Sequence, residues 1–325
     1  MKLYFNEKAH KYTDEFGNKY ISATTLIGNY TNKFSDKEKD IAKACARIGK
    51  NPRHPKYLRY KDKSAKQILA EWKAIRDNAC NIGNNKHSYL EHAVKDSNGF
   101  FNVFKTKYNT KDNNGNVKLF TVEDLSNNIN IGELNIDYFI DTGIKDKYPK
   151  IYEIIKLLVN DGWKIYSEIG VFDSSTLISG LIDILFIKDK DFIILDWKTN
   201  KDTIKFESGY WDKDNNGKTT NYVFTDKRFK PPLDHLPQSV GNKYTLQLSL
   251  YDYLVELFGF NFVTNILCHI KHDVYTYEDE EVVDDITLLG KNKVEILSIK
   301  YLKQDIINMV NHYINVRSNG QLTII

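Results

Sequence analysis

The sequence predicts an α/β protein whose central mixed sheet has four or five strands and is flanked by helices. Three short segments rich in apolar and β-branched residues follow one another closely, at 164–172, 181–187 and 192–195, a pattern typical of neighbouring strands. An amphipathic segment at 244–257 precedes a further apolar segment at 260–270, which predicts a helix and then another strand. Leucines at four helical positions are expected to pack this helix on the sheet: Leu246, Leu250, Leu254 and Leu257.

A hairpin and a mainly helical region are expected before this core. Residues 1–30 contain two strand-like segments around a turn at 14–18, and Ser22 or Thr24 is placed to cap a following helix. A second hairpin is expected around the Asp-Asn-Asn-Gly turn at 112–115. Helices are expected at 37–49, 64–82, 122–125, 136–140 and 151–160.

The remaining segments complete a three-part division of the chain. Residues 1–160 are expected to form the hairpin and helical region, and 161–275 the core, interrupted by an insertion at 200–243 with a turn at 214–217. Residues 276–325 are expected to close the domain with an amphipathic helix at 294–314. With no Pro-, Gly- or Ser-rich linker between them, the three parts are expected to form one compact unit.

Composition excludes several protein classes. The 325 residues are 41% hydrophobic and 27% charged, with a net charge of +3, as in ordinary globular proteins. No apolar run is long enough for a membrane span, so we expect no membrane partner and a cytoplasmic location. Residues 33–73 hold thirteen Lys or Arg against five Asp or Glu. This local excess suits either a phosphate-binding surface or a solvated helical face.

Charged residues interrupt the apolar core segments at four positions: Glu168, Asp183, Asp196 and Lys198. Buried charges cost several kcal/mol unless they are paired, so such residues need a structural or chemical reason. Asp196 and Lys198 lie two apart and point to the same face of a strand. Two carboxylates and a lysine at one place suit a divalent cation and an activated water. The alternative is a buried ion pair between Lys198 and one aspartate.

These residues belong to motifs that occur in a known order. Glu168, Gly180-Leu-Ile-Asp183, Asp196-Trp-Lys198-Thr199 and Gln247-Leu-Ser-Leu-Tyr251 follow Gly83-Asn-Asn-Lys-His87-Ser-Tyr-Leu-Glu91. In this order they resemble the motifs of the PD-(D/E)XK nuclease superfamily, and within it the RecB-like exonuclease branch, over residues 80–255. The opening His-x-Tyr and Ser-x-Thr-Thr-Leu-Ile segments are similar to those of phage-type members.

The resemblance implies a role for each matching residue. His87, Asp183 and Asp196 would bind the metal, with the Trp197 carbonyl as a further ligand, and Lys198 would position the attacking water. Glu168 would bind a second cation directly or through water, and Glu91 would support the ligands. Gln247, Tyr251 and Thr199 would lie near the bound strand. The cofactor is expected to be one or two Mg²⁺ or Mn²⁺ ions, with imidazole favouring Mn²⁺. Three widely spaced cysteines exclude the four-cysteine iron–sulfur cluster of some members.

The expected function is that of a metal-dependent deoxyribonuclease, most readily an exonuclease acting on single strands or duplex ends. Arg53 and Arg59 share a loop with Tyr57 and Tyr60, a mixture of cations and aromatic rings that suits phosphate pairing and base stacking. A role in phage DNA replication or recombination, with proteins of those pathways in the host-cell cytoplasm, follows from the phage-like opening. An inactive nucleic-acid-binding protein, an endonuclease and an RNA-acting nuclease are the alternatives, and the sequence predicts no oligomeric state.

Overall fold

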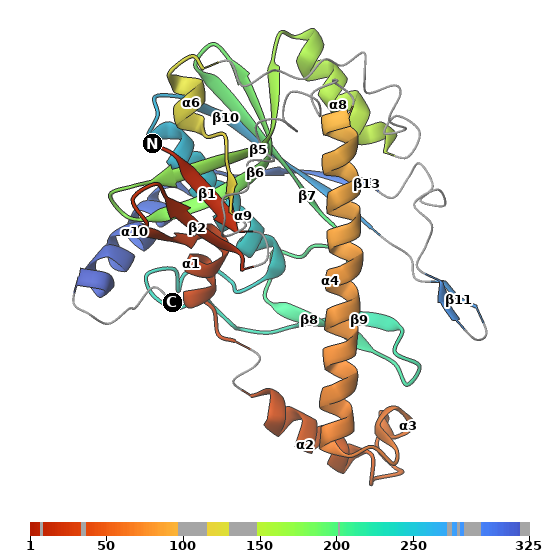
Figure 1. Cartoon of the computed structure of the whole chain (residues 1–325). Helices are drawn as coiled ribbons and strands as arrows, with labels where there is room; N and C mark the ends of the chain where they lie inside the picture. Colours follow the sequence, from red (N-terminus) through yellow and green to blue (C-terminus); the bar gives the residue numbers. More distant parts are fainter. Residues whose placement is uncertain are drawn as a thin grey trace. The chain divides into compact units, whose positions relative to one another are not determined.

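The computed structural model describes residues 1–6, 9–33, 37–96, 116–129, 148–200, 202–271, 275–277, 280–282 and 294–318. The chain folds into two compact units (Figure 1). Unit 1 comprises Met1–Asn29, Lys86–Thr203 and Lys243–Ile325, and unit 2 comprises Tyr30–Asn85 and Ile204–Asn242. Both units are discontinuous in sequence, whereas the three-part division expected from the sequence follows chain order.

Unit 1 is built on a mixed sheet of nine strands in the order β13-β10-β7-β6-β3-β2-β1-β4, with β5 on the other edge of β6. Its long strands are β5 (Lys164–Asp173), β6 (Ile178–Lys188), β7 (Asp191–Lys198) and β10 (Asn261–Ile270). The first three form the predicted antiparallel meander, and β10 pairs parallel with β7. The mixed α/β class is therefore confirmed, whereas the predicted count of four or five strands is wrong.

The additional strands come largely from the N-terminal hairpin. Strands β1 (Leu3–Asn6), β2 (Lys11–Asp14) and β3 (Lys19–Ser22) are antiparallel neighbours, and the short β4 (Val117–Lys118) pairs with β1. The sheet continues into them because β3 pairs parallel with the start of β6, through Ile21 and Ile178. This pairing joins residues distant in sequence, so local patterns in either segment do not reveal it.

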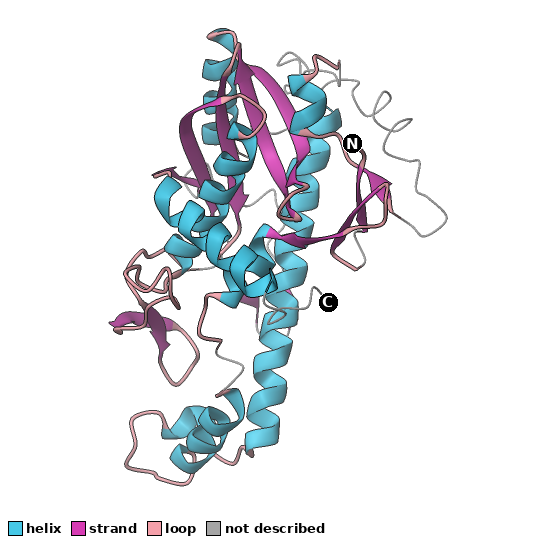
Figure 2. Cartoon of the chain, turned by 90° about the vertical axis from the view of Figure 1, so that its left-hand side faces the viewer, coloured by secondary structure: helices cyan, strands magenta, loops and turns pink. Residues whose placement is uncertain are grey.

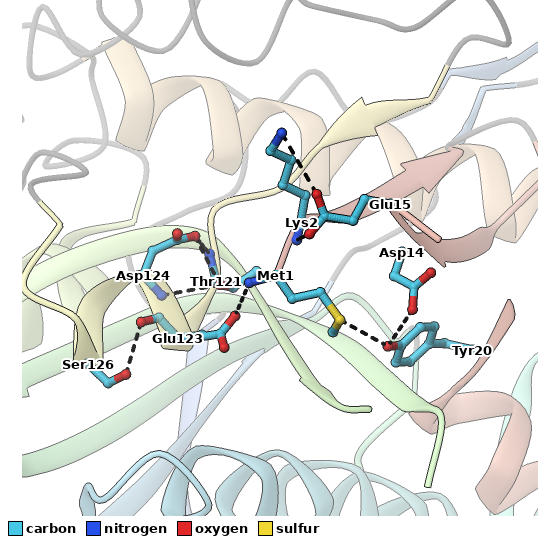
Figure 3. A network of polar contacts seen from close by, with 9 residues as sticks. All are labelled: Met1, Lys2, Asp14, Glu15, Tyr20, Thr121, Glu123, Asp124 and Ser126. Carbon is cyan, nitrogen blue, oxygen red and sulfur yellow. Dashed lines mark hydrogen bonds and ion pairs between the residues drawn. The ribbon is translucent and has the colours of Figure 1, made fainter. Parts of the chain in front are cut away.

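Side-chain hydrogen bonds hold the ends of these N-terminal elements. Asp14 accepts from the backbone N–H groups of Phe16 and Asn18, both at 2.9 Å. It also accepts from the Tyr20 hydroxyl at 3.2 Å, as Figure 3 shows. The predicted turn at 14–18 is thereby confirmed. Ser22 accepts from the Thr25 N–H at 3.2 Å at the start of α1 (Ala23–Asn29), which confirms its capping role.

The predicted helix at 122–125 is also confirmed, as α6 (Val122–Ser126). A reciprocal capping box opens it: the Thr121 hydroxyl accepts from the Asp124 N–H, and the Asp124 carboxylate accepts from the Thr121 N–H (Figure 3). Glu123 in the same turn lies 2.7 Å from the Met1 amino group, beside β1. The hairpin expected at 112–115 and the helix expected at 136–140 lie outside the described residues.

Helices lie on both sides of the large sheet (Figure 2). The predicted helix at 151–160 is confirmed as α8 (Pro149–Asn160), which packs Ile151, Tyr152 and Ile155 against core residues of β5, β6, β7 and β10. Helix α9 (Val240–Glu256) fully buries Leu246, Leu250 and Leu254, as predicted. Leu257 lies past its end and is 49% exposed, so its predicted packing is wrong.

The C-terminal segment corrects a further prediction. Residues 294–299 are not helical but form β13 (Val294–Ile299), antiparallel to β10, and helix α10 (Lys303–Ser318) begins only after them. Val294 and Ile299 are buried at the two ends of the strand. Pairing with the edge of β10 outweighs the helical spacing of apolar residues, because β-branched side chains fit a half-buried strand well. The strands β11 (Tyr275–Tyr277) and β12 (Glu280–Val282) form a separate small pair.

Unit 2 combines helices with a hairpin. It contains α2 (Glu38–Ile48), α3 (Tyr57–Tyr60), the part of α4 (Ala65–Asp96) up to Asn85, and the strands β8 (Gly209–Lys213) and β9 (Thr219–Phe224). The helices predicted at 37–49 and 64–82 are confirmed, and the second continues to Asp96. The predicted turn at 214–217 is confirmed between β8 and β9, where Asp214 accepts from two backbone N–H groups. Among the described residues, no helix has the length and apolarity to cross a membrane.

Candidate active site

Three carboxylates occupy neighbouring positions on three adjacent strands. In the β5–β6 ladder, Ser167 pairs with Ile184 and Ile169 with Ile182, which places Glu168 opposite Asp183. The β6–β7 ladder ends at the pair Ile184 and Leu195, so the next position sets Asp183 opposite Asp196. We call these three residues the acidic row. Each is nearly buried, with exposed fractions of 9% for Glu168, 9% for Asp183 and 2% for Asp196.

Asp183, the middle residue of the acidic row, lies where the pairing of β6 and β7 ends. Strands β6 and β7 are paired from Lys188 and Asp191 up to Ile184 and Leu195. Beyond that point the Asp183 carboxylate accepts a hydrogen bond from the Trp197 backbone N–H at 3.1 Å. A side chain thus satisfies a backbone donor that the diverging strand no longer reaches, and the bond fixes one oxygen of Asp183.

Glu168, at one end of the acidic row, has a strained backbone conformation. Glu168 has φ of +54°, a left-handed conformation that costs a residue with a side chain about 1 kcal/mol. It interrupts the β5–β6 ladder at the position opposite Asp183, where two like charges on facing strand positions repel each other. Strain of this kind concentrates at functional sites, because only the surrounding structure holds it in place.

Lys198 lies against the third carboxylate. Its Nζ is 2.7 Å from the Oδ2 of Asp196, as the same-face spacing predicts. Burial lowers the pKa of Lys198, but the negative charges of Asp196 and Asp183 outweigh it, so the pKa is raised. The lysine is therefore a cation at neutral pH. It balances the charge of one carboxylate in a row of three.

The Lys198 side chain has further neighbours that the sequence analysis missed. Its Nζ lies 5.1 Å from the centre of the Tyr244 ring, within the range of a cation–π interaction. The Tyr244 hydroxyl donates to Asn200 Oδ1 at 2.6 Å, and the carbonyl of Asn200 lies 2.9 Å from His269 Nε2. Tyr244 is three residues before Gln247, so helical spacing alone offered a signal for it. His269 faces Lys198 through the β7–β10 register, which no local pattern shows.

The two residues of the helical Gln-x-x-x-Tyr motif contact each other. Gln247 Nε2 donates to the Tyr251 hydroxyl at 2.9 Å, as their spacing of four in α9 allows. Burial raises the pKa of Tyr251 well above its usual value, and the negative charges of Asp196 and Asp183 add to this effect. Tyr251 is therefore a neutral phenol, and it lies close enough to the acidic row for the carboxylate charges to affect its pKa.

A second tyrosine at the acidic row comes from the N-terminal hairpin. Tyr12 in β2 is 7% exposed, and burial together with the charges of Glu168 and Asp183 raises its pKa. Cys268 in β10 shows the same influence, because burial and then Asp196 and Asp183 raise the pKa of its thiol. Of the two, Tyr12 belongs to the His-x-Tyr segment noted in the sequence, although no site role was predicted for it.

For the remaining predicted site residues, the structure shows the position in the chain but does not test the predicted role. His87 and Glu91 lie in α4, whose backbone is described there, but their side chains lie outside the described part. Thr199 directly follows β7 and is half-buried. The Trp197 side chain is fully buried, and ligation through its carbonyl stays a prediction. Arg53 and Arg59 belong to unit 2.

The acidic row offers hard oxygen donors of the kind that Mg²⁺ and Mn²⁺ prefer. Within the described part of the chain, the buried Oδ2 of Asp196 makes no hydrogen bond beyond its ion pair with Lys198. No group of three His, Cys, Asp or Glu side chains among the described residues is arranged to hold a metal ion. The described residues therefore fit part of a metal site, which a ligand such as His87 would have to complete.

The chain matches no protein-family model, and no curated protein is significantly similar to it.

Proposed function

We propose that this chain is a metal-dependent nuclease that hydrolyses phosphodiester bonds in DNA, with a core of the PD-(D/E)XK type. The observation that carries the proposal is the acidic row on three adjacent strands, with Lys198 bound to its third member at 2.7 Å. A buried ion pair alone explains Lys198 and Asp196. It does not explain why Asp183 and the strained Glu168 stand next to them.

Asp183 and Asp196 would hold Mg²⁺ or Mn²⁺ together with His87, and Glu168 would serve a second ion. The bound metal would polarise the phosphate and lower the pKa of a water. The hydrogen bond from the Trp197 N–H orients the Asp183 carboxylate for this role. Glu91 would support these ligands from the same turn of α4 as His87.

Lys198 acts as a cation rather than as a base. Its raised pKa keeps it protonated at neutral pH, so it offsets charge that develops on the phosphate and orients the attacking water. The Tyr244 ring and Asp196 limit the positions of its ammonium group. Gln247, Tyr251 and Thr199 are proposed to lie along the bound strand, and the neutral phenols of Tyr12 and Tyr251 donate hydrogen bonds there without adding negative charge.

The motif order of the RecB-like branch supports action on DNA ends, and the phage-like opening supports a role in phage DNA replication or recombination. The test uses end-labelled linear and closed circular DNA, single- and double-stranded, together with a matched RNA. Each substrate is incubated with Mn²⁺, Mg²⁺ or EDTA and with the wild type, Asp183→Asn or Lys198→Ala. Asp189→Asn is the matched control, because it changes an exposed turn carboxylate whose φ of +56° suits asparagine.

Metal-dependent loss of linear DNA in the wild type and the control, but not in the two site variants, supports an exonuclease at this site. Cutting of circles makes it an endonuclease, and cleavage of RNA alone changes the substrate class. DNA binding without cleavage under either metal contradicts the proposal and leaves a binding protein with a nuclease-like core.

A further inference from the structure

Positive charge is concentrated in unit 2. Its two segments contain 20 Lys or Arg and 11 Asp or Glu, a net charge of +9, whereas the rest of the chain has 26 and 32, a net charge of −6. The net charge of +3 for the whole chain is therefore the sum of two units of opposite net charge. A unit with this excess attracts polyanions and releases their counterions on binding.

Unit 2 also displays a row of aromatic rings on one face of its hairpin. Trp211 pairs with Tyr222, and Gly209 pairs with Phe224, across β8 and β9. The centres of the Trp211 and Tyr222 rings are 5.1 Å apart, and those of Tyr222 and Phe224 are 5.3 Å apart. We call these three residues the aromatic strip. Phe224 at its end is 68% exposed, so most of its ring is accessible to a ligand.

The strip is held in place before any ligand arrives. A Cβ atom on Gly209 would lie 2.5 Å from Cε1 of Tyr222, so the absence of a side chain there lets the ring lie against the strand. The Tyr222 hydroxyl donates to the Glu207 carbonyl at 2.7 Å and fixes the far end of the ring. Such preorganisation lowers the entropy lost when a ligand stacks on the rings.

Cations accompany the strip. The Lys205 Nζ lies 5.7 Å from the Trp211 ring centre and 6.0 Å from that of Tyr222. The same hairpin is tied to the basic loop of α3: Lys56 forms an ion pair with Asp212, and Arg59 donates to the Lys213 carbonyl at 3.3 Å. Arg59, Tyr57 and Tyr60 were expected in a loop, but they form helix α3. The segment that carries Lys56 and Arg59 therefore contacts the inserted hairpin, although the two are far apart in sequence.

We propose that unit 2 binds single-stranded nucleic acid, with unpaired bases stacked on the aromatic strip and phosphates bound by Lys205 and by other lysines and arginines of unit 2. An exposed ring at the end of a strip that carries a cation favours a single strand over a duplex, because paired bases do not offer their faces to a side chain. The choice of nucleic acid as the ligand rests on the proposed nuclease function. The test of the strand-binding role, however, measures binding and does not depend on cleavage.

The experiment measures fluorescence anisotropy of a labelled oligothymidine with the full chain in EDTA, beside a duplex of equal length. Phe224→Ala is expected to weaken binding of the single strand by about 5- to 150-fold, the range of one lost base–aromatic stack. Phe224→Tyr keeps a stacking face and is expected to bind like the wild type. Phe16→Ala removes a ring that is 76% exposed in unit 1 and is the matched control, with unchanged affinity expected. Lys205→Ala is expected to lessen the salt dependence of binding.

Equal affinity of Phe224→Ala and the wild type, or tighter binding of the duplex than of the single strand, overturns the strand-binding role. The two proposals fail separately. Strand binding that depends on Phe224 without cleavage in any metal removes the nuclease function alone. Cleavage that requires Asp183, with binding indifferent to Phe224, removes the strand-binding role alone.

Discussion

The Tyr251 ring lies directly over the backbone of Gly180, so that a Cβ atom on Gly180 would be 2.3 Å from Cε1 of Tyr251. The glycine of the Gly-x-x-Asp segment and the tyrosine of the helical motif are therefore two halves of one packing contact. That contact fixes α9 against β6 close to Asp183. It gives a physical reason for a glycine at this position, independent of any backbone conformation.

Gly180→Ala is expected to destabilise the protein by about 1 to 3 kcal/mol, as overpacking of a close contact does. Urea unfolding followed by circular dichroism measures the change. Gly28→Ala in α1 is the matched control, because nothing lies within 4 Å of its added Cβ, and it is expected to be neutral or slightly stabilising. If Tyr251→Ala in the same chain does not recover part of the loss, the contact between Gly180 and Tyr251 is not its cause.

Lys198→Ala is expected to lower the rate of DNA cleavage at saturating substrate by about 100-fold or more. The variant removes a fixed cation from the place where negative charge develops, an effect of the size seen when one oxyanion donor is lost. Single-turnover cleavage of labelled linear DNA measures the rate. Lys190→Ala, which changes an exposed lysine in the turn before β7, is expected to leave it unchanged. A similar loss in both variants would show that general charge, and not the position of Lys198, is responsible.

Local patterns in the sequence were sufficient for many of the elements but not for their pairing. The meander, α9 and the turn at 14–18 were predictable because alternation, helical spacing and turn residues act over a few positions. Strand β13 was missed because its pairing with β10 decides its structure. At the site, the acidic residues stand out because charges are rare in apolar strands. Tyr12 reaches them only through the β3–β6 pairing, which depends on contacts between distant segments.

The stability of the N-terminal hairpin is expected to depend on pH through Asp14. Burial raises the pKa of Asp14, but hydrogen bonds from Asn18, Phe16 and Tyr20 outweigh it, so the pKa is lowered on folding. A lowered folded pKa means that the carboxylate stabilises the protein above the unfolded pKa of about 3.9 and that this contribution is lost as the pH falls through the folded value.

Urea unfolding between pH 3 and pH 7 tests this expectation. Asp14→Asn should be less stable than the wild type at pH 7, by about 1 kcal/mol for the charged hydrogen bonds that it loses. The difference should shrink as the pH falls below about 4. Asp189→Asn, which changes an exposed carboxylate in the turn between β6 and β7, is the control for general carboxylate effects. A difference that stays constant across the range would show that the Asp14 charge does not contribute.

Divalent cations are expected to stabilise the protein through the acidic row. Carboxylates on facing strand positions repel one another, so an ion bound by Asp183 and Asp196 favours the folded state. Addition of Mn²⁺ or Mg²⁺ to EDTA-treated protein should raise the melting temperature. At a metal concentration one hundred times the dissociation constant, the free energy of unfolding should increase by about 2.7 kcal/mol. Asp196→Asn should remove most of the rise, and Asp189→Asn should preserve it. An equal rise in both variants would place the ion elsewhere, because the second change leaves all three carboxylates of the row intact.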